Sequence, residues 1–302
     1  MLRIVPRLPR ELFIGLFDDA AVFPPGNAPL DHAVAQHRAF RASRQSDLVG
    51  PLLLPAASLA AAADLAGLAD LTDAPLVAGA DRGEPGPLDV VVIGRPGADP
   101  QAVIGAVDLA ARDDRLTLCG VEIGWSESWR ELDLSAPRIV LELPRGTEQA
   151  LALTDIATAL AEREGQPGTT YAAKFRTGAT DTWDWPAERE LARAIQAAVS
   201  MDVPLKLTGG LHHAVRSTVE GTEHHGVLNV LLAFAEARAG RTVAALTGIL
   251  AQRDPQSVLA GLEGLGTGRL ARIRADFPAY GCCQVGDPIS ELGELDALDS
   301  AL

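Results

Sequence analysis

Short apolar runs alternate with helix-like segments along the chain of 302 residues, and this alternation limits the possible folds more than any other feature. It is typical of parallel α/β folds, in which each strand is followed by a helix that packs on the sheet. The expected strands lie at 12–23, 48–55, 88–94, 116–124, 138–144, 169–179, 203–216 and 277–287. The expected helices between them lie at 30–43, 56–68, 99–113, 147–165 and 186–202.

Eight strands with intervening helices are what a (β/α)8 barrel requires. We therefore predict an α/β fold in which residues 1–302 form a single TIM-type barrel domain. Two helices, at 225–240 and 241–254, are expected as an excursion between strands seven and eight, and the tail 288–302 closes the fold with a short helix. An open doubly wound sheet is the alternative, but no G-x-G-x-x-G fingerprint follows an early strand.

Charge and hydropathy exclude several classes of partner. The net charge is −14 and no basic run occurs, so neither nucleic acid nor an anionic membrane is expected to bind. No apolar run reaches the roughly 18 residues of a membrane span, and the N-terminus lacks the features of a signal peptide. The three cysteines are odd in number and lack the spacing of a zinc site. We expect a cytoplasmic homo-oligomer.

Two lysines stand out among 26 basic side chains, because Lys174 and Lys206 are the only ones that are not arginine. A lysine amine can lose its proton and attack a carbonyl carbon, whereas a guanidinium stays protonated. Each lysine lies in an expected strand that runs into glycine. The pattern predicts that the amines have a chemical role; two compact cations kept by chance are the alternative.

Strand parity predicts which side chains face the barrel interior, because successive strand residues point to opposite sides. On strand four, Cys119, Val121 and Ile123 are expected to face the helices, which turns Glu122 inward. The same reasoning applies to strands five, six and seven. It places inward Glu142, Lys174, Arg176, Lys206 and Thr208.

Charges at the carboxyl ends of barrel strands indicate an active site, because that is where barrel enzymes have theirs. One of Asp18 and Asp19, at the end of strand one, is expected to join the cluster. A structural network of ion pairs is the alternative, since buried charges must be paired. Gly209, Gly210 and Gly281 follow the last two strands, and backbone N–H groups freed by such turns bind anions. We therefore expect a small anionic substrate.

The motifs K-F-R-T-G (174–178) and K-L-T-G-G (206–210) resemble the paired lysine motifs of class I deoxyribose-phosphate aldolases, which are (β/α)8 barrels. The resemblance implies that Lys174 forms the Schiff base and that Lys206 tunes its amine. It also implies that phosphate is held by Gly209, Gly210 and the turn that begins at Gly281. The chain departs from the aldolases at Phe175 and Arg176, where they have small hydroxylated residues.

A longer pattern is similar to an unassigned family of bacterial barrel proteins. It comprises K-x-R-T-G, L-H-H at 211–213, H-G-x-L-N at 225–229 and G-x-C-x-x-x-x-P at 281–288. That family brings no function with it.

Four of the six histidines fall within fourteen residues: His212, His213, His224 and His225. Histidine moves protons and binds metals near neutral pH, but this spacing matches no known set of metal ligands. Substrate contact by His212 or His213 and plain loop structure are both possible. Adjacent Cys282 and Cys283 are expected to fill the core. A redox pair is the alternative, but a disulfide between neighbouring cysteines is strained.

The tryptophans near the strand ends also allow two interpretations. Trp183 and Trp185 follow strand six, and Trp125 and Trp129 follow strand four. Each pair is expected either to cover the site or to pack against the next helix.

These observations favour a lyase of the aldolase type, with no cofactor. Lys174 is expected to condense with a carbonyl substrate, Lys206 to lower the pKa of Lys174 by like-charge proximity, and Glu122 or Glu142 to move protons. Arg176, Thr208 and the glycine turns then bind the anionic group. The alternatives are a metal-dependent hydrolase or isomerase that uses the four clustered histidines, and a non-catalytic barrel that binds a small anion.

Overall fold

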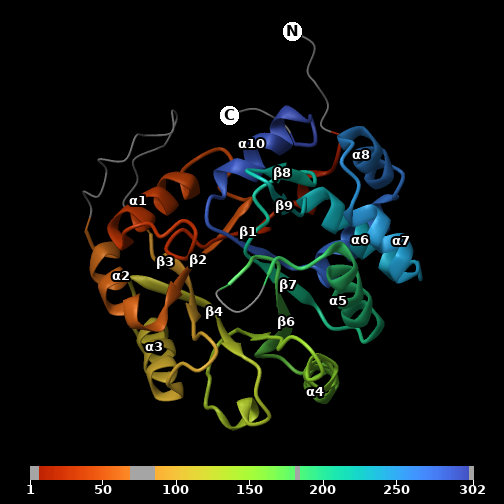
Figure 1. The fold of residues 1–302 in the computed structure, drawn as a ribbon. Coiled ribbons are helices and arrows are strands. Elements are labelled where there is room, and N and C mark those ends of the chain that lie inside the picture. Colours follow the sequence, from red (N-terminus) through yellow and green to blue (C-terminus); the bar gives the residue numbers. More distant parts are fainter. Residues whose placement is uncertain (1–6, 69–85, 181–183, 299–302) are drawn as a thin grey trace. The chain divides into compact units, whose positions relative to one another are not determined.

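The computed structural model describes residues 7–68, 86–180 and 184–298. The strands close into a barrel in the order β1-β10-β7-β6-β5-β4-β3-β2, which confirms the predicted (β/α)8 TIM-type barrel over the open sheet (Figure 1). Its strands are β1 Phe17–Asp19, β2 Val49–Pro55, β3 Leu88–Ile93, β4 Leu116–Gly124, β5 Arg138–Glu142, β6 Thr170–Arg176, β7 Leu205–Thr208 and β10 Tyr280–Cys282.

Helices follow the strands much as the sequence predicts. In the first half they are α1 Leu30–Arg41, α2 Leu59–Ala66, α3 Pro100–Arg112 and α4 Gln149–Glu162, with short 3-10 helices at Arg10–Leu12, Ala56–Ser58 and Trp129–Glu131. In the second half they are α5 Glu188–Ser200, α6 Val227–Arg238, α7 Val243–Leu250, α8 Pro255–Glu263, α9 Thr267–Asp276 and α10 Gly286–Glu294.

The start of α3 shows how local sequence sets these elements. The side chain of Asp99 accepts a hydrogen bond from the N–H of Gln101, and Pro100 occupies the first helical position, where no N–H is needed. Buried residues then recur with the spacing of one helix face, at Val103, Ala106, Val107 and Ala110. This face contacts β3 and β4.

Residue contacts divide the chain into two compact units, Asp18–Lys174 and Met1–Phe17 with Phe175–Leu302. The first unit contains Glu122, Glu142 and Lys174, and the second contains Lys206 and the histidine cluster. The prediction of a single domain over 1–302 stays a prediction.

The connection between β7 and β10 is more elaborate than the expected two-helix excursion. It contains four helices, α6 to α9, and an antiparallel hairpin of β8 Ser217–Val219 and β9 Thr222–His224. Glu220 and Gly221, both with positive φ, make the hairpin turn, a conformation that glycine adopts at no steric cost. Figure 1 shows α7 and α8 beside α6, in agreement with the contacts that α6 makes with each of them.

The first and last barrel strands are shorter than predicted. Residues 12–23 supply only the three strand residues of β1, and 277–287 supply only the three of β10. Across the described ranges, every helix is too short or too polar to pass through a bilayer.

Candidate active site

Three charged side chains meet near the carboxyl ends of β4, β5 and β6. The amine of Lys174 lies 2.8 Å from Oε2 of Glu122 and 2.9 Å from Oε2 of Glu142. We call these three residues the Lys–Glu–Glu cluster. Its members come from three neighbouring strands and from sequence positions up to 52 residues apart. All three were predicted from strand parity.

Strand register explains why these side chains meet. Glu142 is the direct partner of Lys174 on β6 and of Gly124 on β4, and direct partners point to the same side of a parallel sheet. Glu122 precedes Gly124 by two residues, so it projects to this same side. Gly124 itself adds no side chain there, and a Cβ at this position would lie 3.2 Å from Pro96.

Burial differs among the members of the cluster. The side chains of Lys174 and Glu122 are 4% and 1% exposed, whereas that of Glu142 is 12% exposed. The cluster is therefore most accessible at Glu142. Glu122 is almost fully buried.

Burial alone lowers the pKa of Lys174, but the charges and hydrogen bonds of Glu122 and Glu142 outweigh it and raise that pKa above its ordinary value of 10.5. The expectation of a lowered pKa for Lys174 is therefore wrong. A cation with two carboxylates at hydrogen-bond distance is held in its protonated form. Before the amine can attack a substrate, the ammonium must lose a proton, and the neighbouring carboxylates can accept it.

Strand parity predicts the wrong side for one residue of β4. The register between β3 and β4 shifts between Val90 and Val91, which inserts an extra residue in β4 at Cys119. Cys119 consequently packs against a cluster that contains Leu53, Val91 and Ile93, and Ile93 is the register partner of Glu122. The prediction that Cys119 faces the helices is wrong because of this bulge. Val121 is fully buried, and Ile123 is almost fully buried.

The two aspartates of β1 have different surroundings. Asp19 lies 3.0 Å from Nδ1 of buried His37 on α1, so it is turned toward a helix. Asp18 lies over β2, where a Cβ at Gly50 would come within 2.0 Å of its Oδ1. The sequence did not indicate the partnership of Asp19 with His37, because no local spacing connects a strand to its following helix.

The second unit contains the remaining predicted residues. Lys206 is buried within β7, and Thr208 and Gly281 are register partners across β7 and β10. Arg176 ends β6 and is partly exposed. The N–H of Gly209 donates to the carbonyl of Gly281 at 3.2 Å, so the expectation that this N–H binds an anion is wrong. The donor is used to join two strand ends.

Thr177 and Gly210 show why the Thr-Gly and Gly-Gly pairs occur. The N–H of buried Thr177 donates to the carbonyl of Thr208 at 2.8 Å, and its hydroxyl donates to Thr208 and Gly209. Gly210 has a φ of +76°, and a Cβ there would meet the ring of Trp185 at 2.2 Å. These residues form a closely packed crossing of two loops.

The adjacent histidines of the cluster have separate partners. His212 lies between Cys282 and Cys283, whereas Nδ1 of His213 lies 2.7 Å from Oε1 of Glu291. No spacing in the sequence indicates Glu291, which lies 78 residues away on α10. His213 also meets the ring of His224, with centroids 5.5 Å apart.

His225 has a structural role. Its Nε2 lies 2.9 Å from the carbonyl of Pro186 and its Nδ1 lies 3.3 Å from the guanidinium of Arg216. Since guanidinium has no acceptor, Nδ1 accepts and Nε2 carries the proton that is donated to Pro186. Burial lowers the pKa of His225. The neutral ring thus joins three segments of the chain.

Asn229 completes this support and explains the H-G-x-L-N motif. Its Oδ1 accepts from the N–H of Arg216 at 3.0 Å, and its Nδ2 donates to the carbonyls of Ile249 and Gln252. All of these contacts hold the loop after β7 against α6 and α7. The motif is therefore explained by loop support.

The described residues contain no group of three or more His, Cys, Asp or Glu side chains arranged to hold a metal ion. The clustered histidines are instead distributed among a cysteine pair, a glutamate, an indole and a backbone carbonyl. The metal-dependent alternative therefore gains no support from this geometry.

The described tryptophans pack against neighbouring groups. The indole N–H groups of Trp125 and Trp129 donate to Asp155 on α4 at 2.9 and 2.6 Å. Trp185 packs against the ring of His224 at a centroid distance of 4.7 Å. Trp183 lies outside the described residues. For Trp125 and Trp129, packing against the next helix is the correct alternative.

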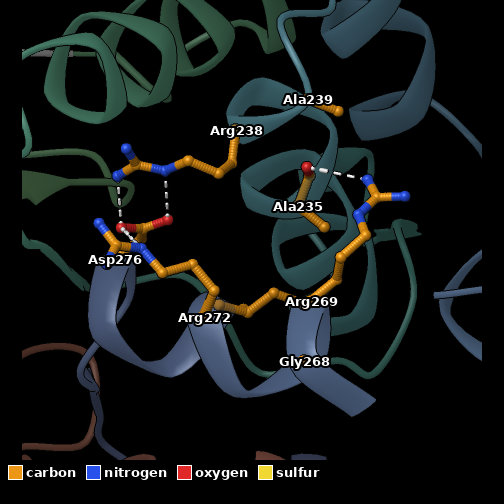
Figure 2. Close-up of a pocket in the computed structure, with 8 residues that line it drawn as sticks. Ala235, Arg238, Ala239, Gly268, Arg269, Arg272 and Asp276 are labelled. Carbon is orange, nitrogen blue, oxygen red and sulfur yellow. Dashed lines mark hydrogen bonds and ion pairs between the residues drawn. The ribbon is translucent and has the colours of Figure 1, made fainter. Parts of the chain in front are cut away.

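A cavity of about 230 Å³ lies between α6 and α9, away from the strand ends. Figure 2 shows its arginines, of which Arg238 forms a paired contact with Asp276. Arg269 contacts Glu236 at 2.8 Å, and Arg272 contacts Asp202 at 3.3 Å. Each guanidinium is neutralised by a carboxylate, and no strand residue lines the cavity. It is not the candidate active site.

Comparison of the chain with protein-family models, curated proteins and solved structures gives no match. The functional argument therefore rests on the geometry of the site.

Proposed function

We propose that the protein is a lyase that forms a Schiff base between Lys174 and a small carbonyl substrate. The observation that supports this proposal is the position of one buried amine between two carboxylates, near the carboxyl ends of three barrel strands. Barrel enzymes have their active sites at that end. TIM barrels are common among enzymes, but the fold does not identify a reaction.

The carboxylates can accept the proton that the raised pKa of Lys174 keeps on its amine. Glu142, the more exposed partner, takes a proton from the ammonium as the substrate arrives, and the free amine attacks the carbonyl carbon. The resulting carbinolamine loses water with that proton, which leaves a protonated imine on Lys174. Glu122 retains its charge throughout.

The same electrostatic arrangement then stabilises the intermediate. A protonated imine carries its positive charge at the atom where the ammonium carried it, so the charges that raise the pKa of Lys174 also favour the iminium. When the substrate has a β-hydroxyl group, a carboxylate accepts its proton and the carbon–carbon bond breaks. The electron pair moves toward the iminium nitrogen to give an enamine, and protonation and hydrolysis release the second product.

The roles of the second unit stay predictions. A catalytic role is expected of Lys206. Substrate binding is expected of Arg176, Thr208, Gly210, His212, His213 and Gly281. Gly209 is removed from the set of anion donors because its N–H is bonded within the protein.

Trapping with borohydride tests the proposal directly. The protein is incubated with a panel of small aldehydes, ketones and keto acids, reduced, and measured by intact mass and peptide mapping. Because the chain has only two lysines, peptide mapping needs to distinguish only Lys174, Lys206 and the N-terminal amine. Lys174→Arg keeps the positive charge and removes the reactive amine, and Lys206→Arg is the matched control.

We expect an adduct on Lys174 in the wild type and in Lys206→Arg, and none on that position in Lys174→Arg. Circular dichroism of each variant establishes that the fold is retained. Absence of an adduct with every carbonyl compound, or trapping confined to Lys206, would overturn the proposal. The Lys–Glu–Glu cluster would then be a structural ion-pair network.

A further inference from the structure

The imidazole of His212 lies between two thiols in the turn after β10. Its Nε2 lies 3.4 Å from Sγ of Cys283, and its Nδ1 lies 3.8 Å from Sγ of Cys282. These residues belong to one compact unit and take no part in the Lys–Glu–Glu cluster. Cys282 is 1% exposed and Cys283 is 8% exposed, so the second thiol is the more accessible of the two.

Hydrogen bonding fixes the direction of each contact. The thiol of Cys282 donates its proton to the carbonyl of Leu211 at 3.7 Å, which leaves its sulfur as an acceptor toward His212. Nδ1 of His212 is then the protonated nitrogen, and Nε2 is free to accept the S–H of Cys283. The result is a chain from Cys283 through His212 and Cys282 to Leu211.

This order is that of a nucleophile, a base and a group that orients the base. We propose that Cys283 is a nucleophilic thiol that His212 activates, in a site for soft electrophiles such as α,β-unsaturated carbonyl compounds. Sulfur forms a bond to the β-carbon as the carbon–carbon π bond breaks. The proton of Cys283 passes to Nε2 of His212 and from there to the α-carbon, so no other reactant is needed.

The ionisable groups near His212 are compatible with a base. Burial is the main influence and lowers the pKa of His212, Asp287 raises it, and His224 and His213 lower it further. The net direction is downward, which keeps the ring neutral and able to accept a proton near pH 7. A ring that was already protonated could not take the thiol proton.

Cys119 provides an internal comparison. It is more exposed than Cys283, but burial and the charges of Asp89 and Asp18 raise its pKa to about 11. Cys119 is thus the slow reference thiol in the same molecule, because little of it is thiolate at pH 7. The contribution of His212 is read from the change in the rate at Cys283 when His212 is replaced.

The test is the rate of modification of each thiol by acrylamide at pH 7, followed by peptide mapping. We expect Cys283 to react at least about tenfold faster than Cys119 in the native protein, since a positioned base contributes that much or more. In guanidinium the three rates should become similar. His212→Gln should reduce the rate at Cys283 by at least about tenfold and leave Cys119 unchanged.

Cys283→Ser provides a second variant that is close in size to the wild type. It should lose the fast adduct and keep the slow ones, as measured by intact mass over time. Faster modification of Cys119 or Cys282, or an unchanged rate at Cys283 in folded His212→Gln, would overturn the proposal.

Discussion

Glu142 and Lys174 are direct partners across β5 and β6, and their side chains form an ion pair at 2.9 Å. Glu122 approaches the same amine from β4 at 2.8 Å. One cation thus forms ion pairs with two anions in a buried position, where an unpaired charge is costly. The arrangement ties the stability of the fold to the chemistry that we propose for it.

Replacing Lys174 by methionine should destabilise the protein strongly. The change removes the cation that lies between two carboxylates, and breaking a buried pair in this way costs about 3–5 kcal/mol. Adding Glu122→Gln should recover part of the loss, because the two sites are coupled. Urea denaturation measures both effects.

Arg112→Met is the matched control, because Arg112 pairs with Asp108 on an exposed helix face. Its unfolding midpoint should hardly change, since exposed pairs contribute little. Equal effects of Lys174→Met and Arg112→Met would show that the Lys–Glu–Glu cluster does not stabilise the fold.

The alkaline limit of stability should depend on Glu122. The folded pKa of Lys174 is raised above 10.5, so its contribution is fully present below pH 10.5 and is lost as the pH rises through the folded value. In Glu122→Gln one carboxylate is gone while burial still lowers the pKa of Lys174. The folded pKa then lies closer to or below the unfolded value, so the loss of stability above pH 10.5 should be smaller than in the wild type. Urea denaturation from pH 8 to 12 measures this loss, and identical profiles would contradict the prediction.

The acidic limit should depend on His225. Its pKa in the folded protein lies below the ordinary 6.5, because burial, and then Arg216, oppose the charged ring. As the pH falls below 6.5 the unfolded chain takes up a proton before the folded protein does, and stability is lost. His225→Gln should reduce the slope of stability against pH between 4 and 6.5.

His32→Gln is the control for this experiment, since His32 is exposed on α1. The slope of stability against pH in His32→Gln should match that of the wild type. Some slope should persist in His225→Gln, because burial also lowers the pKa values of His212 and His224. An unchanged slope in His225→Gln would contradict the assignment of a neutral ring.

The sequence predicts the barrel because eight apolar runs alternate with helical segments, and it predicts the Lys–Glu–Glu cluster because strand side chains alternate with a period of two. Apolar residues alternate with charges on β4 to β6, and the register of parallel strands keeps side chains of equal parity together. Glu122, Glu142 and Lys174 were found in this way. Strand parity gives the wrong side for Cys119 because a bulge shifts the parity of β4, and the adjacent Gly120 is the sequence signal for that bulge.

Other features depend on contacts that sequence spacing does not encode. Glu291 reaches His213 across 78 residues, and Gly209 gives its N–H to Gly281. Helix α8 is absent from the predicted elements, although Asp254 and Pro255 form a typical helix start. Asp254 is also the last residue of the helix expected at 241–254. The raised pKa of Lys174 depends on distances that only the folded chain defines.

Gly226 allows the loop after β7 to lie directly on the start of α6, and Gly226→Ala should disturb this contact. A Cβ at Gly226 would come within 2.4 Å of the backbone of Val215 and Arg216, and a backbone cannot turn aside as a side chain can. The loop must shift, which weakens the bond from the N–H of Arg216 to Asn229. We expect a loss of about 1–3 kcal/mol, as for other overpacked sites.

Gly248→Ala is the matched control for this substitution. Gly248 lies within α7, and nothing is within 4 Å of the position that its Cβ would take. Alanine there should stabilise the protein by about 0.5–1 kcal/mol, because glycine is unfavourable inside a helix. Thermal and urea denaturation should therefore move in opposite directions for the two variants. A shift of the same sign in both would show that general helix propensity, rather than the close approach at Gly226, decides the outcome.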